Sequence, residues 1–233
     1  MNQANSRAAL YGAGITILTL FGGIAFGFVS GSLVFNVLPG HSISNPNPAH
    51  IFIAALPALG GFFAGSALWG ILLGRLSHAE NWKRLALAGA LGFAPLTLAL
   101  AILMQALEPI AVEQLGAVFP IHRLFTFFFV PSAFLIAGVS AFAIGIGLQD
   151  KSLAWQLFWR VGIAAALAFL AVNLVMEANG WVVGAPRAAE RATMLTVLFA
   201  GNFAAAIFGG AMLGVLCARQ NSVMRVQTQH GMI

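Results

Sequence analysis

Charge is what this sequence lacks most. It has 11 Lys and Arg and 6 Asp and Glu among 233 residues, so only 7% of the chain is charged, against about 25% in an ordinary soluble domain. Hydrophobic residues make up 60% of the chain, and the mean hydropathy is +0.93. This composition cannot cover a water-facing surface, so it excludes a soluble globular protein and predicts that the apolar side chains face lipid.

Further absences exclude several kinds of chemistry. Cys217 is the only cysteine, so the chain has no internal disulfide. Both lysines, Lys83 and Lys151, lie outside the long apolar runs, which excludes a retinal-type Schiff base in a helix bundle. Gly-x-Ser-x-Gly, His-Glu-x-x-His and Walker patterns are absent, so the residues that a hydrolase, zinc protease or ATPase needs are lacking. We expect no enzyme activity, and no motif identifies a cofactor.

Long uncharged runs are what the sequence has instead. About 20 apolar residues suffice to cross the hydrocarbon core of a membrane, and six runs reach that length. They cover residues 10–38, 51–76, 85–107, 124–148, 154–176 and 194–218. The connections between them are too short for a soluble domain. The sequence therefore predicts an all-α fold, a polytopic integral membrane helix bundle of six transmembrane helices, with residues 1–233 forming a single membrane domain.

The basic residues predict the orientation of these spans. Eight of them fall on one side of the six runs and three on the other, and basic residues near helix ends are retained in the cytoplasm. Both termini are therefore expected inside, in a multi-pass protein of a prokaryotic inner membrane. The net charge of +5 then reflects topology, and its partner is the lipid bilayer with its anionic inner leaflet rather than a nucleic acid. The eight are Arg7, Arg75, Lys83, Arg84, Lys151, Arg160, Arg219 and Arg225; the three are Arg123, Arg187 and Arg191.

Small residues four apart recur along the runs and predict close helix packing. Examples are Gly23, Gly27 and Gly31 in the first run, and Gly210 and Gly214 in the last. Such glycine-rich faces also suit contacts with a second copy or with partners in a membrane complex. The segments 63–75 and 208–219 resemble each other, which favours a duplicated hairpin; shared lipid composition is the alternative explanation.

Polar residues in or near the spans are the candidates for a substrate site. Gln105 and Glu108 stand one turn apart near the end of the third run, and Asn173 and Glu177 do so in the fifth. Asn202 lies in the sixth run. Amide hydrogen bonds between helices are the structural alternative for these residues. Pro57, Pro95 and Pro131 interrupt three runs and can expose backbone groups to a pathway.

Three histidines are candidates for a metal site at the predicted outer face. His41, His50 and His122 lie in or beside the outer connections, and imidazole suits divalent transition metals. They come from different connections and form no metal-binding motif, so hydrogen bonding to water or lipid headgroups is the alternative.

One segment carries a resemblance to a known family. Gly184-Ala185-Pro186, followed by an Ala-rich stretch with Asn202 and Phe208 ahead of Gly214, resembles the end of a family of predicted cobalt transporters. The chain lacks the His- and acid-rich elements expected earlier in such a protein, so the resemblance implies no metal specificity.

Taken together, these features favour a small inner-membrane transporter or permease-like protein that moves a small solute or cation through a helix bundle. One alternative is a non-catalytic membrane component of a larger complex, held by the glycine-rich faces. Another is a membrane redox protein with a haem or quinone near the outer face, beside His50 and His122.

Overall fold

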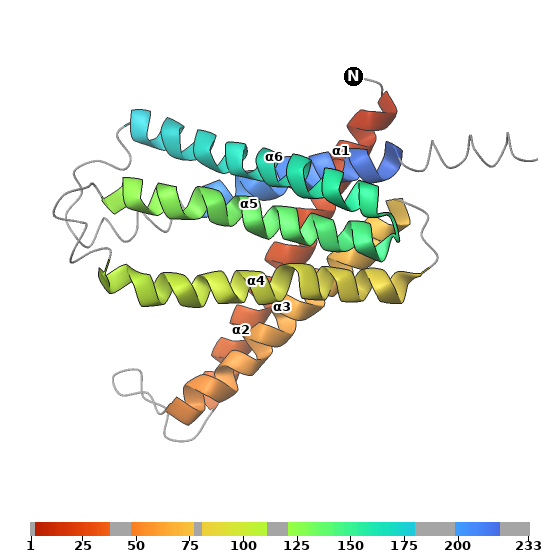
Figure 1. Cartoon of the computed structure of the whole chain (residues 1–233). Coiled ribbons are helices and arrows are strands. Elements are labelled where there is room, and N and C mark those ends of the chain that lie inside the picture. Colours follow the sequence, from red (N-terminus) through yellow and green to blue (C-terminus); the bar gives the residue numbers. More distant parts are fainter. Residues whose placement is uncertain (1–2, 38–47, 77–80, 111–120, 180–198, 220–233) are drawn as a thin grey trace, which may run out of the picture.

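The computed structural model is built from helices. It describes residues 3–37, 48–76, 81–110, 121–179 and 199–219 (Figure 1), and these residues form no strand. Six helices are long and apolar enough to cross a membrane. The expected all-helical fold and the expected number of candidate spans are therefore confirmed.

The first span is one continuous helix with a single irregular turn near its middle. Its parts are α1 (Gln3–Thr16), the π-helical turn η1 (Ile17–Phe21) and α2 (Gly22–Val37). The helix begins at Gln3, earlier than the uncharged run at 10–38, because a helix continues beyond the apolar segment and carries Arg7 on its first turns. A π-turn places about one extra residue in the helical register.

Five further helices complete the bundle. They are α3 (Pro48–Leu76), α4 (Trp82–Ile110), α5 (Ile121–Gly147), α6 (Lys151–Ala178) and a last helix, Phe199–Arg219. Asp150 caps α6 by accepting a hydrogen bond from the backbone N–H of Leu153 at 2.8 Å. In Figure 1, α4, α5 and α6 run side by side, whereas the first span and α3 cross them obliquely.

The helices form a closed ring in which neighbours in the sequence are neighbours in space. The first span contacts α3, α3 contacts α4, α4 contacts α5, and α5 contacts α6. The last helix packs on α6, since a Cβ on Gly209 would lie 3.5 Å from the Cβ of Ala165. It also packs on α1, since a Cβ on Gly210 would lie 2.9 Å from the Gly12 carbonyl oxygen. The last of these contacts closes the ring.

Glycine lies at every seam of the ring, and at the first span it lets backbones touch. A Cβ on Gly23 would lie 2.6 Å from the carbonyl oxygen of Gly61, and a Cβ on Gly61 would lie the same distance from that of Gly23. Helices in lipid gain little from hydrophobic association, so they depend on close packing of this kind. The remaining seams contain Gly70 and Gly89 (α3 and α4), Gly92 (α4 and α5), and Gly138, Gly145 and Gly162 (α5 and α6).

The π-turn accounts for the way the first span serves two partners. Gly12 lies against the last helix and Gly23 lies against α3. Residues eleven apart on a regular α-helix point in almost the same direction, within about 20°. The extra residue of the π-turn rotates everything after it by about 100°, so η1 aims the second glycine row at a different helix.

The two similar segments of the sequence occupy similar places. Gly65 in segment 63–75 contacts the first span at Thr19 and Gly23, and Gly210 in segment 208–219 contacts it at Gly12 and Thr16. Both segments therefore use an equivalent glycine to approach the same helix, on either side of η1.

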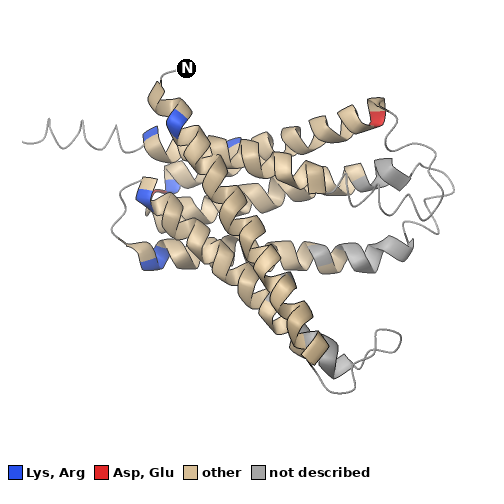
Figure 2. Cartoon of the chain, turned by 180° about the vertical axis from the view of Figure 1, so that it is seen from behind, with Lys and Arg blue, Asp and Glu red and all other residues tan. Residues whose placement is uncertain are grey.

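Basic residues gather at one end of the bundle. Every Lys and Arg whose side chain the structure describes lies toward the end where α3 finishes and α4 begins (Figure 2). Glu177, in the last turn of α6, lies at the opposite end. Arg160 is exposed rather than buried in the bundle, as expected of a long side chain that reaches toward the interface.

The seam between the first and last helices can be tested with two alanine substitutions on α1. In Gly12→Ala the new Cβ would collide with the backbone of Gly210 and Gly214, whereas a Cβ on Gly14 meets nothing within 4 Å. We expect Gly12→Ala to lower the free energy of unfolding by about 2 kcal/mol. Gly14→Ala should leave it unchanged or raise it by up to about 1 kcal/mol, because alanine favours helix. Denaturant unfolding in mild detergent measures both, and equal losses would contradict the proposed seam.

Candidate functional site

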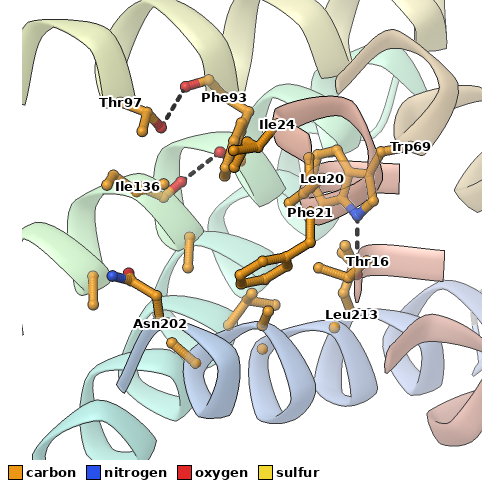
Figure 3. Close-up of a pocket in the computed structure, with 18 of the residues that line it drawn as sticks. Thr16, Leu20, Phe21, Ile24, Trp69, Phe93, Thr97, Ile136, Asn202 and Leu213 are labelled. Atoms are coloured by element: carbon orange, nitrogen blue, oxygen red, sulfur yellow. Dashed lines mark hydrogen bonds between the residues drawn. The ribbon is translucent and has the colours of Figure 1, made fainter. Parts of the chain in front are cut away.

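A chamber of about 230 Å³ lies between the six spans (Figure 3). Its lining residues on the last helix extend from Phe199 to Leu213, a length of about 20 Å at the helical rise. Every span contributes to the wall. Representative lining residues are Thr16 and Phe21 from the first span, Trp69 from α3, Phe93 and Thr97 from α4, Ser140 from α5, Val161 from α6 and Asn202 from the last helix.

The chamber is mostly apolar, and no Lys, Arg, Asp, Glu or His belongs to its lining. Four aromatic residues contribute to it: Phe21, Trp69, Phe93 and Phe199. An apolar cavity of this kind stays dry and can bind a small apolar molecule. Left empty, it would cost about 5 kcal/mol of packing energy at about 24 cal/mol per Å³. A void this expensive, shared by all six spans, is typical of a binding site.

A buried chain of hydrogen bonds links α3 to the first span at the chamber wall. The indole Nε1–H of Trp69 donates to Thr16 Oγ1 at 3.0 Å, and this hydroxyl donates to the Gly12 carbonyl oxygen at 2.8 Å. Trp69 and Thr16 are both buried. Thr16 immediately precedes η1, so the chain of bonds holds the entry to the π-turn against α3 (Figure 3).

Two further hydroxyl groups at the wall also donate to backbone carbonyls. Thr97 Oγ1 donates to the Phe93 carbonyl oxygen at 2.8 Å. Ser140 Oγ donates to Ile136 within α5 and lies 3.2 Å from the Gly92 carbonyl oxygen on α4. A hydroxyl has one proton and two lone pairs, so with the proton directed at the backbone these oxygens offer the chamber an acceptor.

Aromatic pairs lie at the edges of the chamber. Phe21 from the first span and Phe203 from the last helix make an edge-to-face contact with ring centroids 5.7 Å apart. Phe93 contacts Phe62 at 5.4 Å and Trp69 at 6.4 Å between centroids. Phe199 lines the chamber and is 63% exposed, so the chamber reaches the surface of the described structure at the start of the last helix.

The structure separates the predicted polar residues. Asn202 lies in the chamber wall. Asn173 is buried, but its Nδ2–H donates to the Phe169 carbonyl oxygen one turn earlier in α6 at 2.8 Å, and it does not line the chamber. Glu177 is half-buried one turn further along and also lies outside the lining. Only Asn202 of these three thus reaches the central space.

The remaining predicted site residues lie outside the described part of the structure. This holds for His41 altogether, and for the side chains of Gln105, Glu108, His50 and His122. Within the described residues no three His, Cys, Asp or Glu side chains come together. The outer metal site therefore stays a prediction.

The prolines do not line the chamber. Pro95 and Pro131 are exposed on the outside of the bundle, and Pro57 is half-buried in α3. A proline ring removes one backbone donor, but here that position faces away from the central space at Pro95 and Pro131.

Sequence reasoning missed the hydroxyl residues and Trp69. A search for charges and amides inside the spans passes over Ser and Thr, because their hydroxyls can bond their own helix and are common in apolar segments. The usable signal was the recurrence of Thr16, Thr97 and Ser140 within three different uncharged runs. No family model, curated protein or solved structure matches the chain.

The bond between Trp69 and Thr16 can be tested by a double-mutant cycle. Thr16→Val leaves the buried indole N–H without its acceptor, which should cost about 1–3 kcal/mol of unfolding free energy. Trp69→Phe removes that donor, so the double variant should be about 1 kcal/mol more stable than the two single losses predict. Thr19→Val is the matched control, because its hydroxyl donates to the Ile15 carbonyl of its own helix. Strict additivity would contradict the coupling.

Proposed function

We propose that this protein is a small permease-like membrane transporter whose substrate site is the central chamber. The observation that supports this most is the contribution of all six spans to one chamber of about 230 Å³. Structural packing alone has no use for a space that is costly to leave empty. Membrane transporters commonly place their substrate near the middle of the bundle, between helices that can move against one another.

The lining favours an uncharged solute over a cation. No charged side chain lines the chamber, and a bare charge in such surroundings is expensive. An engineered cavity of about 150 Å³ holds benzene, so a chamber of about 230 Å³ suits a molecule of about ten non-hydrogen atoms.

The first span supplies features that suit a moving part. It contacts α3 and the last helix through glycines, which present few side chains that must disengage. The π-turn η1 carries Leu20 and Phe21 into the chamber wall, and π-turns occur frequently at functional sites. In the proposed mechanism, the first span shifts along its glycine seams and opens the edge closed by Phe21 and Phe203.

The proposed setting is a prokaryotic inner membrane, with both termini in the cytoplasm. The support is the gathering of described basic side chains at one end of the bundle (Figure 2) and the retention of such residues in the cytoplasm. A membrane component docked on partners through glycine faces is less favoured, because the described glycine seams are already used inside the bundle.

Transport can be tested by filling the chamber. Ala206 lines it, and Ala204 on the same helix does not. We expect proteoliposomes with the wild-type protein to pass at least one solute of a broad panel faster than protein-free vesicles do. Ala206→Leu should reduce that flux at least tenfold while raising the free energy of unfolding by about 1–2 kcal/mol, because the side chain fills space.

Ala204→Leu is the control for the flux measurement and should leave it unchanged. A panel of charged and uncharged solutes with no difference between wild-type and protein-free vesicles would contradict the transport proposal. Loss of flux without loss of stability in Ala206→Leu identifies the chamber as the route.

The orientation can be tested with a reporter at each end of the chain. Green fluorescent protein fused after Ile233 should fluoresce, because that protein matures in the cytoplasm, and alkaline phosphatase at the same place should be inactive. The same pair fused before Met1 should give the same result. Fluorescence loss with phosphatase activity at either end would overturn the proposed topology.

A further inference from the structure

The hydroxyl groups of the chamber wall all direct their protons into the backbone. Thr16, Thr97 and Ser140 donate to the carbonyl oxygens of Gly12, Phe93 and Ile136, respectively. These bonds leave oxygen lone pairs as the polar feature that the hydroxyls present. A ligand that meets such a wall gains a hydrogen bond only if it brings its own donor.

Thr97 is the hydroxyl best placed to receive that donor. Thr16 already accepts the Trp69 indole N–H at 3.0 Å and is 5% exposed. Ser140 lies between two carbonyl oxygens and is 2% exposed. Thr97 is only half-buried, and within the described residues no group donates to its oxygen. In Figure 3, Thr97 borders the same space as Phe93 and Asn202.

The rest of the wall defines the remainder of the ligand. Four aromatic residues line the chamber, and aromatic rings pack favourably edge-to-face with other rings. With no charged side chain in the lining, nothing compensates the desolvation of an ionic group.

We propose that the chamber binds an uncharged ring-bearing molecule of about ten non-hydrogen atoms that carries one hydrogen-bond donor, of the phenol type, and that Thr97 Oγ1 accepts this donor. This rests on the proposed function, since it gives the substrate class of the same site. Thr97 acts as a specificity-determining residue, because it separates donors from isosteres that have none.

The test compares two ligands of equal shape in nanodiscs. 4-Ethylphenol carries a hydroxyl where 4-ethyltoluene carries a methyl group. Equilibrium dialysis measures the binding of each to wild-type discs, and discs with Ala206→Leu correct for partition into lipid. We expect 4-ethylphenol to bind about fivefold more tightly to wild type than to Thr97→Val, the factor that one hydrogen bond of ordinary net strength supplies. 4-Ethyltoluene should bind both equally, and 4-ethylbenzoate should bind neither.

Thr97→Ser keeps the hydroxyl and should keep the preference, which separates the loss of the acceptor from a disturbed α4. Equal loss of both ligands in Thr97→Val, binding of the benzoate, or no binding of 4-ethylphenol above the Ala206→Leu discs would each overturn the inference. The flux panel distinguishes this failure from that of the proposed function. Selective binding without flux ends transport alone, whereas flux of some solute without the phenol preference ends only the ligand assignment.

Discussion

Close approach of backbones along the first span is the constraint on which the rest of this structure depends. That span lies against α3 at Gly23 and against the last helix at Gly12, so it connects the two ends of an otherwise sequential row of helices. Without side chains at these points, the helices come near enough to close a ring. The chamber exists because the ring is closed on this side by a helix that is thin at two levels.

The π-turn turns a repetitive sequence into a directional one. The glycine rows on the two sides of η1 would face one partner if the helix were regular, and the extra residue turns the second row toward α3. The same turn brings Leu20 and Phe21 into the chamber wall. Packing and site geometry therefore depend on one local irregularity, held in place by the bond from Trp69 to Thr16.

Composition and run length were enough to predict the helices, because six uncharged stretches in a chain with 7% charged residues leave no other fold open in lipid. The glycine rows predicted close packing, which the structure bears out at Gly12 and Gly23. The chamber could not be predicted in the same way. It depends on which face each helix turns inward, and η1 changes that face within one span with no signal in residue type. Asn202 was found because amides are rare in spans, whereas Thr97 was not, since a hydroxyl bonded to its own helix resembles packing.

The ring closes between the first helix and the last, at Gly12 and Gly210. During synthesis the first helix enters the membrane long before the last one emerges, so its face around Gly12 and Thr16 waits without its final neighbour while four other helices are inserted. The chamber wall on that side is completed only when the last helix docks. Assembly order thus makes the last helix the element whose arrival converts a row of inserted helices into a protein with an interior.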